Sequence, residues 1–199
     1  MTTPSLLRNA RHIVIDMQRL FAEETVWHTP AVTEILPNVL DLTRAFAGRT
    51  LFAKFMVPAA PSHATGRWRT YYERWSMLTT GTMDPAMQDL VAPLAVLAEP
   101  RNVIEKSTYS VFGAPDFHER MTAEDVDTLI FSGVETDICV LASLFDAIDA
   151  GFHVIVASDA IGSSAPLSHA ATVEHILPRM PEQVEFRTTA ELVAAASLL

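Results

Sequence analysis

The sequence predicts a single α/β domain over residues 1–199, built as a three-layer α/β/α sandwich around a mostly parallel six-stranded sheet. Short runs of apolar, often β-branched residues alternate along the chain with segments of helical periodicity, which is typical of parallel strands joined by right-handed crossovers. With 199 residues and 49% hydrophobic residues the chain can form one substantial core. The composition does not change along the chain in a way that would indicate a second domain.

Six segments have the length and composition of strands: residues 12–15, 50–57, 102–105, 128–131, 153–157 and 184–186. The first is a nearly continuous apolar run, which suits a central strand that is buried on both faces. Pro58 ends the second strand, because proline cannot donate to a strand ladder.

Helices are expected at about residues 31–47, 85–97, 115–121, 137–150 and 167–177, and from residue 189. Gly48 and Gly151 are placed to end the first and the fourth of them. Residues 59–82 lack periodicity and are rich in tryptophan, tyrosine and arginine. Long excursions of this kind tend to be functional lids or partner contacts.

The charge balance excludes some partners. Fourteen Lys and Arg residues against 24 Asp and Glu residues give a net charge of −10, which argues against nucleic acid or an anionic membrane as the main partner. A single cysteine forms no internal disulfide, and residues 1–8 lack the apolar core of a signal peptide. We therefore expect a cytoplasmic protein with no membrane and no nucleic-acid partner.

The only cysteine, Cys139, follows a predicted buried strand and a turn at residues 133–135. With Thr136 as the N-cap, Cys139 falls in the first helical turn, where free backbone N–H groups and the helix dipole stabilise an anion. We expect a lowered thiol pKa, which would make Cys139 a nucleophile. The alternative is that Cys139 is a small buried hydrophobic residue.

Two charged residues end other predicted strands. Asp16 follows the first strand and Lys106 the third, so both are expected at the same sheet edge as the turn before Cys139. A carboxylate can take the thiol proton, an ammonium favours both anions, and a thiolate can attack an acyl carbon. Taken singly, Asp16 suits a solvated strand end and Lys106 a surface lysine.

Other chemistries have less support. The seven histidines are scattered and no Gly-x-Ser-x-Gly elbow is present, which disfavours a Ser-His-Asp hydrolase. No glycine-rich phosphate loop follows the first strand, which disfavours nucleotide binding. A non-catalytic ligand-binding or redox-sensing protein, in which Cys139 is oxidised reversibly, stays open as the alternative function.

Three ordered segments carry a resemblance to a known family. They are Ile13-Val14-Ile15-Asp16-Met17-Gln18 with Phe21, Ile104-Glu105-Lys106 with Ser110-Val111-Phe112, and Ser132-Gly133-Val134-Glu135-Thr136-Asp137-Ile138-Cys139-Val140. Together they resemble the signature segments of the isochorismatase-like cysteine hydrolases, over roughly residues 11–192. The resemblance implies the Rossmann-like fold of that family.

The resemblance also implies roles for single residues. Asp16 would be the general base, Lys106 its electrostatic partner and Cys139 the nucleophile. A cis peptide bond would join Val134 and Glu135, and the backbone N–H groups of Glu135 and Cys139 would form the oxyanion hole.

Departures from the family pattern narrow the expected chemistry. Nicotinamidases of this family carry an Asp-x-His metal segment after the second strand, whereas this chain has residues 54–58 and an isolated His63 there. We therefore expect no metal and no other cofactor. Isochorismatases proper lack the cysteine, so its presence favours cleavage of a C–N bond in a small amide, carbamoyl or ureido substrate through a thioester.

Aromatic residues are expected to wall the substrate pocket. The candidates are Phe21, Phe55, Trp75, Tyr109 and Phe112. Ordinary core or interface packing is the alternative for several of them. A second aromatic group, Trp68, Tyr71 and Tyr72, suits a subunit interface, because the resemblance implies a homo-oligomer, either a dimer or a tetramer.

Overall fold

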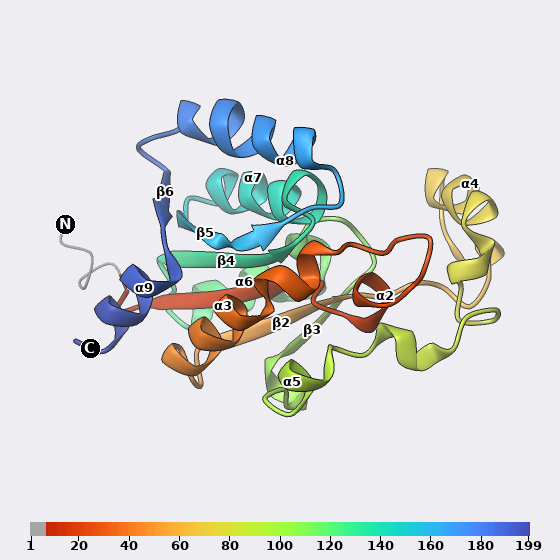
Figure 1. The fold of residues 1–199 in the computed structure, drawn as a ribbon, viewed down its shortest axis with the longest axis horizontal. Helices are drawn as coiled ribbons and strands as arrows, with labels where there is room; N and C mark the ends of the chain where they lie inside the picture. Colours follow the sequence, from red (N-terminus) through yellow and green to blue (C-terminus); the bar gives the residue numbers. More distant parts are fainter. Residues whose placement is uncertain (1–6) are drawn as a thin grey trace.

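The computed structural model describes residues 7–199. They form a six-stranded sheet in which all strand pairs are parallel, with helices on both faces (Figure 1). The strands are β1 (Ala10–Ile15), β2 (Thr50–Phe55), β3 (Val103–Lys106), β4 (Thr128–Val134), β5 (His153–Gly162) and β6 (Val184–Arg187), in the spatial order β3-β2-β1-β4-β5-β6. The predicted α/β class is confirmed.

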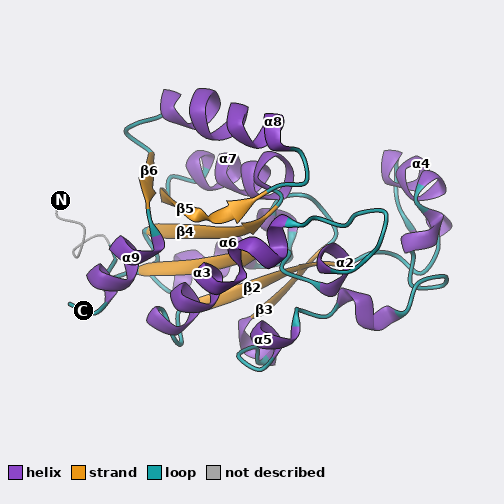
Figure 2. Cartoon of the chain, viewed as in Figure 1, coloured by secondary structure: helices purple, strands orange, loops and turns teal. Residues whose placement is uncertain are grey.

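Helices form the two outer layers (Figure 2). On one face α3 (Ala31–Ala45) and α9 (Thr189–Ala196) pack against the sheet, and on the other lie α6 (Phe117–Ala123), α7 (Leu141–Asp149) and the helical segment that begins with α8 (Pro166–Ala171). The chain moves outward from β1 to β3 and then returns to β4, so strand order reverses between the neighbours β1 and β4. Ligands of such sheets bind beyond the carboxyl ends of the strands at this point.

A hydrophobic core lies on each face of the sheet, and the side chains of β1 alternate between the two cores. Val14 faces the core under α3, whereas Ile13 and Ile15 face the core under α7, and all three are fully buried. His12 is also buried in this strand, where its ring nitrogens lie 3.2 Å from Thr50 Oγ1 and 2.8 Å from Ser132 Oγ. Burial lowers the pKa of His12 to about 3, so the ring is neutral and its role is to join three strands.

The predicted helix over residues 85–97 is wrong. A 3₁₀ turn at Pro85–Gln88 is followed by extended chain and by the single turn α5 (Ala92–Ala95). Tertiary pairing overrides the helical pattern, because Leu90 forms an antiparallel bridge with Gln18. The Gln18 side chain also donates to the carbonyls of Phe55 and Gln88, at 3.1 and 2.7 Å.

Two further short helices flank the carboxyl edge of the sheet. They are α2 (Arg19–Ala22), directly after β1, and α4 (Arg67–Arg74), inside the segment expected to lack periodicity. In Figure 1, α4 stands apart from the sheet on the side of α2. Both helices bring aromatic side chains to this edge.

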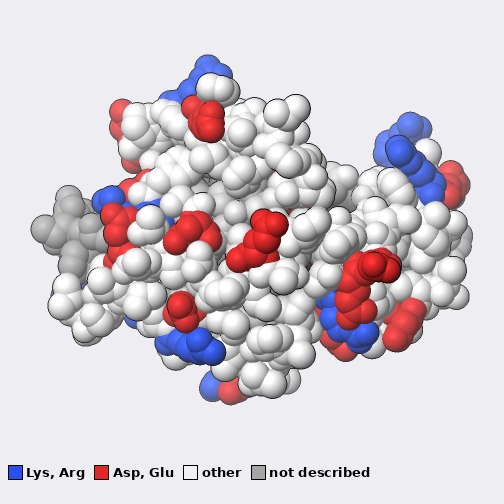
Figure 3. Space-filling view, viewed as in Figure 1, with Lys and Arg blue, Asp and Glu red and all other residues white. Residues whose placement is uncertain are grey.

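Charged side chains are dispersed over the surface. On the face drawn in Figure 3, Lys and Arg lie in small separate groups and form no continuous basic patch. Within the part of the chain that the structure describes, no helix has the length and apolar character needed to cross a membrane.

The close approach of β1 and β4 at Gly133 can be tested by substitution. Gly133 has φ +108°, and a Cβ atom there would lie 2.0 Å from the Ile15 carbonyl oxygen in the backbone of β1. Gly48 has φ +74° with open space around it, so Gly48→Ala is expected to cost only the backbone term of about 1 to 2 kcal/mol. We expect Gly133→Ala to lower the free energy of unfolding in urea by at least about 2 kcal/mol more than Gly48→Ala does. Equal losses would contradict the close approach of β1 and β4.

Candidate active site

Three chemically useful side chains meet at the carboxyl edge of the sheet. Asp16 directly follows β1, Lys106 is the last residue of β3, and Cys139 lies in the helical segment Thr136–Val140 that precedes α7. Asp16 has φ 53°, and its N–H still donates to the Ala53 carbonyl at 2.9 Å. This left-handed conformation turns the chain at the strand end.

Asp16 and Lys106 form a buried ion pair. The Lys106 ammonium donates to Asp16 Oδ2 at 2.9 Å and to the Thr108 carbonyl at 3.2 Å, and both paired side chains are at most 1% exposed. Because β2 separates β3 from β1, the lysine reaches across the end of β2, where its ammonium lies 4.9 Å from the centre of the Phe55 ring. The aromatic ring and the carboxylate together compensate a buried cation.

The second carboxylate oxygen of Asp16 takes no part in the ion pair. Within residues 7–199, Asp16 Oδ1 has no hydrogen-bond partner of good geometry. Cys139 is nevertheless close enough for each group to shift the pKa of the other. Burial raises the pKa of Asp16, and the Lys106 ammonium acts in the opposite direction. A buried carboxylate with a spare lone pair beside a thiol is suited to accept its proton.

The predicted lowering of the thiol pKa is wrong. Burial raises the pKa of Cys139 well above its ordinary value, the charge of Asp16 raises it further, and Lys106 lowers it. The local geometry also differs from the prediction, because Thr136 belongs to the helical segment and its hydroxyl pairs with His169 Nδ1 at 3.0 Å instead of capping the helix. The rise in the thiol pKa that burial causes is therefore larger than any lowering by the helix terminus.

The turn between β4 and Cys139 arranges backbone groups. The Val134–Glu135 peptide bond is cis. The Glu135 carbonyl accepts hydrogen bonds from the N–H groups of Ile138 and Val140, both at 3.1 Å, and not from the N–H of Cys139 that lies between them.

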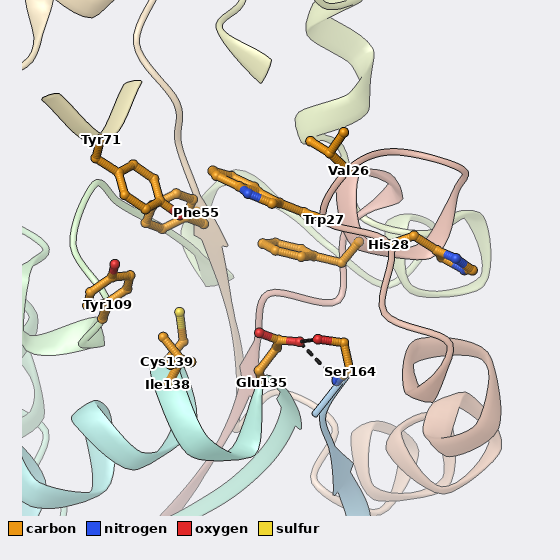
Figure 4. A pocket seen from close by; sticks show the side chains of 11 residues that line it. Val26, Trp27, His28, Phe55, Tyr71, Tyr109, Glu135, Ile138, Cys139 and Ser164 are labelled. Atoms are coloured by element: carbon orange, nitrogen blue, oxygen red, sulfur yellow. Dashed lines mark hydrogen bonds between the residues drawn. The ribbon is translucent and has the colours of Figure 1, made fainter. Parts of the chain in front are cut away.

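A cavity of about 260 Å³ opens above the sulfur (Figure 4). Three of the aromatic residues predicted for the pocket line it: Phe21, Phe55 and Tyr109. Cys139 is 7% exposed, so its thiol is reached through this cavity. The walls are mostly apolar, as in sites that hold small flat groups.

Two predicted pocket residues lie elsewhere. Phe112 packs on the opposite face of the sheet, with its ring 5.0 Å from that of Phe117, because the turn at Val111–Gly113 directs it into that core. Trp75 packs against Trp27, with 6.2 Å between the ring centres, and does not line the cavity. Both predictions of a substrate contact are therefore corrected.

Trp27 also lines the cavity, although no motif or periodicity in the sequence singles it out. Its ring stacks on Phe21 at 6.1 Å and 9°, and it also contacts Phe55 and Tyr71. Trp27 was detectable in principle, because it is the one aromatic residue in the loop after α2 and loops that follow β1 lie at the carboxyl edge. Tyr71, expected at an interface, also lines the cavity.

The polar side of the cavity was missed as well. The Glu135 side chain accepts hydrogen bonds from Thr29 Oγ1 at 3.2 Å and from the Ser164 N–H at 2.9 Å, and also from the Ser164 hydroxyl. Only the backbone of Glu135 had been singled out. No periodicity or spacing in the sequence brings Thr29, Glu135 and Ser164 together.

The residues after β2 do not fit the metal site of nicotinamidases. Residues 54–58, at the end of β2 and just after it, contain no Asp or His, and His63 lies on a 3₁₀ turn. Within residues 7–199, no group of three or more His, Cys, Asp or Glu side chains is placed to hold a metal ion. We derive no step through a metal.

Known proteins resemble this chain in sequence and in fold. A family model described as the Isochorismatase domain matches residues 10–191. A probable inactive nicotinamidase of Arabidopsis thaliana is 27% identical over 173 residues, which cover 83% of this chain and 87% of that protein. Ureidoacrylate amidohydrolase RutB of Methylorubrum extorquens is 26% identical over 178 residues, covering 77% and 70%. The crystal structure of a cysteine hydrolase from Pseudomonas syringae pv. phaseolicola superposes with a TM-score of 0.79 and 24% identity, covering 99% of this chain and 95% of that one.

These matches extend over the whole parallel sheet and the edge that carries the cavity. The fold is that of the isochorismatase-like hydrolases. The chain belongs to the isochorismatase family.

The ion pair generates a stability prediction. Lys106→Met leaves the Asp16 carboxylate buried and unpaired, and we expect it to lower the free energy of unfolding in urea by about 3 to 5 kcal/mol. Arg44→Met is the control, because Arg44 pairs with the Asp41 carboxylate at 3.1 Å with both side chains more than half exposed. Its loss should cost less than about 1 kcal/mol.

The loss of stability in Lys106→Met should depend on pH. Without the ammonium, the pKa of Asp16 rises further, so the folded state binds this proton more tightly than the unfolded state does. Stability then falls as pH rises from the unfolded pKa towards the folded one, and the loss in Lys106→Met is larger at about pH 8 than at about pH 5. A loss that is the same at both pH values would contradict a buried charge pair.

Proposed function

We propose that this protein hydrolyses a C–N bond of a small amide, carbamoyl or ureido substrate through a thioester on Cys139. The observation that carries the proposal is the Asp16–Lys106 ion pair beside a nearly buried thiol that lines an aromatic cavity. Asp16 is the general base, Lys106 its electrostatic partner and Cys139 the nucleophile. The name of the ureidoacrylate amidohydrolase relative supports an amide or ureido substrate.

The reaction begins from an uncharged thiol. Burial and the neighbouring carboxylate both disfavour a free thiolate. As the sulfur attacks the carbonyl carbon, its proton passes to Asp16 Oδ1, the oxygen without another partner. Lys106 stays bonded to the other oxygen and keeps the carboxyl group in place.

The negative charge that develops on the substrate oxygen needs donors. In the proposal, these are the backbone N–H groups of Glu135 and Cys139 at the turn above β4. The protonated Asp16 then returns its proton to the leaving nitrogen, and ammonia or an amine departs. Water hydrolyses the thioester, with Asp16 again as the base, and the free thiol is restored.

The alternative function, a non-catalytic ligand-binding or redox-sensing protein, has one supporting observation, since one relative is named a probable inactive nicotinamidase. A peroxide-sensing thiol is expected to be of low pKa and accessible. Cys139 has a raised pKa and is 7% exposed, which favours the hydrolase. A cytoplasmic location and a homo-oligomeric assembly complete the proposal.

The catalytic roles predict large losses of activity. A screen that reads out ammonia across amides, carbamoyl amino acids and ureides first identifies a substrate. Cys139→Ala is then expected to lower kcat/KM by at least about 1,000-fold, and Asp16→Asn by about 100- to 10,000-fold. Asp146→Asn, the same change on the exposed side of α7, is the control and should keep wild-type activity. Full activity of Cys139→Ala would refute the proposal.

A further inference from the structure

One carboxylate oxygen of Glu135 is fixed by the surrounding protein. Oε1 accepts hydrogen bonds from the Ser164 N–H at 2.9 Å and from the Ser164 hydroxyl. It also shares the Thr29 hydroxyl proton with the Trp27 carbonyl, since both oxygens lie 3.2 Å from Thr29 Oγ1. Thr29 is 1% exposed, so one of these donors belongs to the rigid interior. The orientation of the carboxylate is therefore set before any ligand binds.

The other oxygen is free. Within residues 7–199, Glu135 Oε2 accepts no hydrogen bond. Figure 4 shows this oxygen on the side of the carboxylate that faces the cavity and Cys139, away from Ser164. The cavity thus contains a negatively charged hydrogen-bond acceptor with a fixed orientation. A purely structural role would need only the bonds to Oε1.

Nothing in the cavity balances this charge. Among the described residues that line it, none is a lysine or an arginine, and His28 is exposed at the margin with its ring turned outward (Figure 4). Lys106 lies below the floor and is already bonded to Asp16 and Thr108. A substrate carboxylate placed here would lose its hydration and meet a like charge.

Five aromatic residues make up much of the rest of the wall. Trp27 stacks on Phe21, and Figure 4 shows Tyr71, Phe55 and Tyr109 across the cavity from Glu135 and Ser164 or beside the sulfur. Aromatic faces bind flat apolar groups and attract cations, and the hydroxyls of Tyr71 and Tyr109 add neutral polar groups but no positive charge.

From these contacts we infer that Glu135 is the specificity-determining residue of the cavity. Its Oε2 accepts a hydrogen bond from an N–H or ammonium group of the substrate. The favoured substrates are amides or ureides with an aromatic or apolar body that are neutral or cationic, and acyl groups with a carboxylate are rejected. The inference rests on the proposed function for the position of the reacting group. It adds the charge of the substrate and the aromatic or apolar character of the rest of the molecule.

A binding experiment tests the inference without requiring turnover. The probes are three benzamides of similar size: para-(aminomethyl)benzamide, para-methylbenzamide and para-carboxybenzamide. Their dissociation constants are measured by calorimetry on Cys139→Ser at about pH 8, where an imidazole of ordinary pKa is neutral. We expect the cationic probe to bind at least about tenfold more tightly than the carboxylate probe.

The second arm removes the charge of Glu135. In Cys139→Ser with Glu135→Gln, which keeps an oxygen for the donors to Oε1, we expect the ratio between the cationic and carboxylate probes to fall at least about tenfold. Glu174→Gln is the matched control, because it removes the same charge from an exposed position and should leave the ratio unchanged. A merely structural role of Glu135 would weaken all three probes equally.

Several results would overturn the inference. They are equal binding of the cationic and carboxylate probes, tighter binding of the carboxylate probe, an unchanged ratio in the Glu135→Gln protein, or binding of none of the three. Because binding is measured on a protein that lacks the nucleophile, these results are separate from a failure of hydrolysis, which would overturn the proposed function alone.

Discussion

The buried ion pair between Asp16 and Lys106 is the interaction on which the rest of the site depends. Two charges removed from water are stable only when each finds the other and further polar contacts. Here the lysine must cross the end of β2 to reach the end of β1, over the ring of Phe55. This requirement fixes three strands relative to one another at the edge where the cavity forms. It also leaves one oxygen of Asp16 unpaired next to Cys139.

The reactivity of the thiol follows from that environment. A sulfur next to a carboxylate and away from water holds its proton, so charge separation is delayed until a substrate carbonyl is present to receive the electrons. The aromatic wall lowers the polarity around the sulfur, which strengthens electrostatic contacts there. Glu135 serves this arrangement twice, through its backbone at the turn beside the sulfur and through its side chain in the cavity.

Much of the fold and the position of the reactive residues could be predicted from the sequence. The strands are short apolar segments, and the burial of the central ones on both faces is visible in their composition. Asp16 and Lys106 stand where two of these segments end. What could not be predicted depends on contacts between distant segments. The bridge of Leu90 to Gln18 replaced an expected helix, and the hydrogen bonds that orient Glu135 join three separate loops. The pKa of Cys139 was misjudged because a helix terminus is a local feature and burial is not.

The most direct test concerns the protonation state of Cys139 at rest. Because it is the only cysteine in the chain, the S–H stretching band in the infrared difference spectrum between the wild-type protein and Cys139→Ala belongs to this thiol. We predict that the band is present at about pH 7 and persists to pH values above the ordinary thiol pKa. Absence of the band at about pH 7 would show a resting thiolate and would contradict proton transfer to Asp16 during attack.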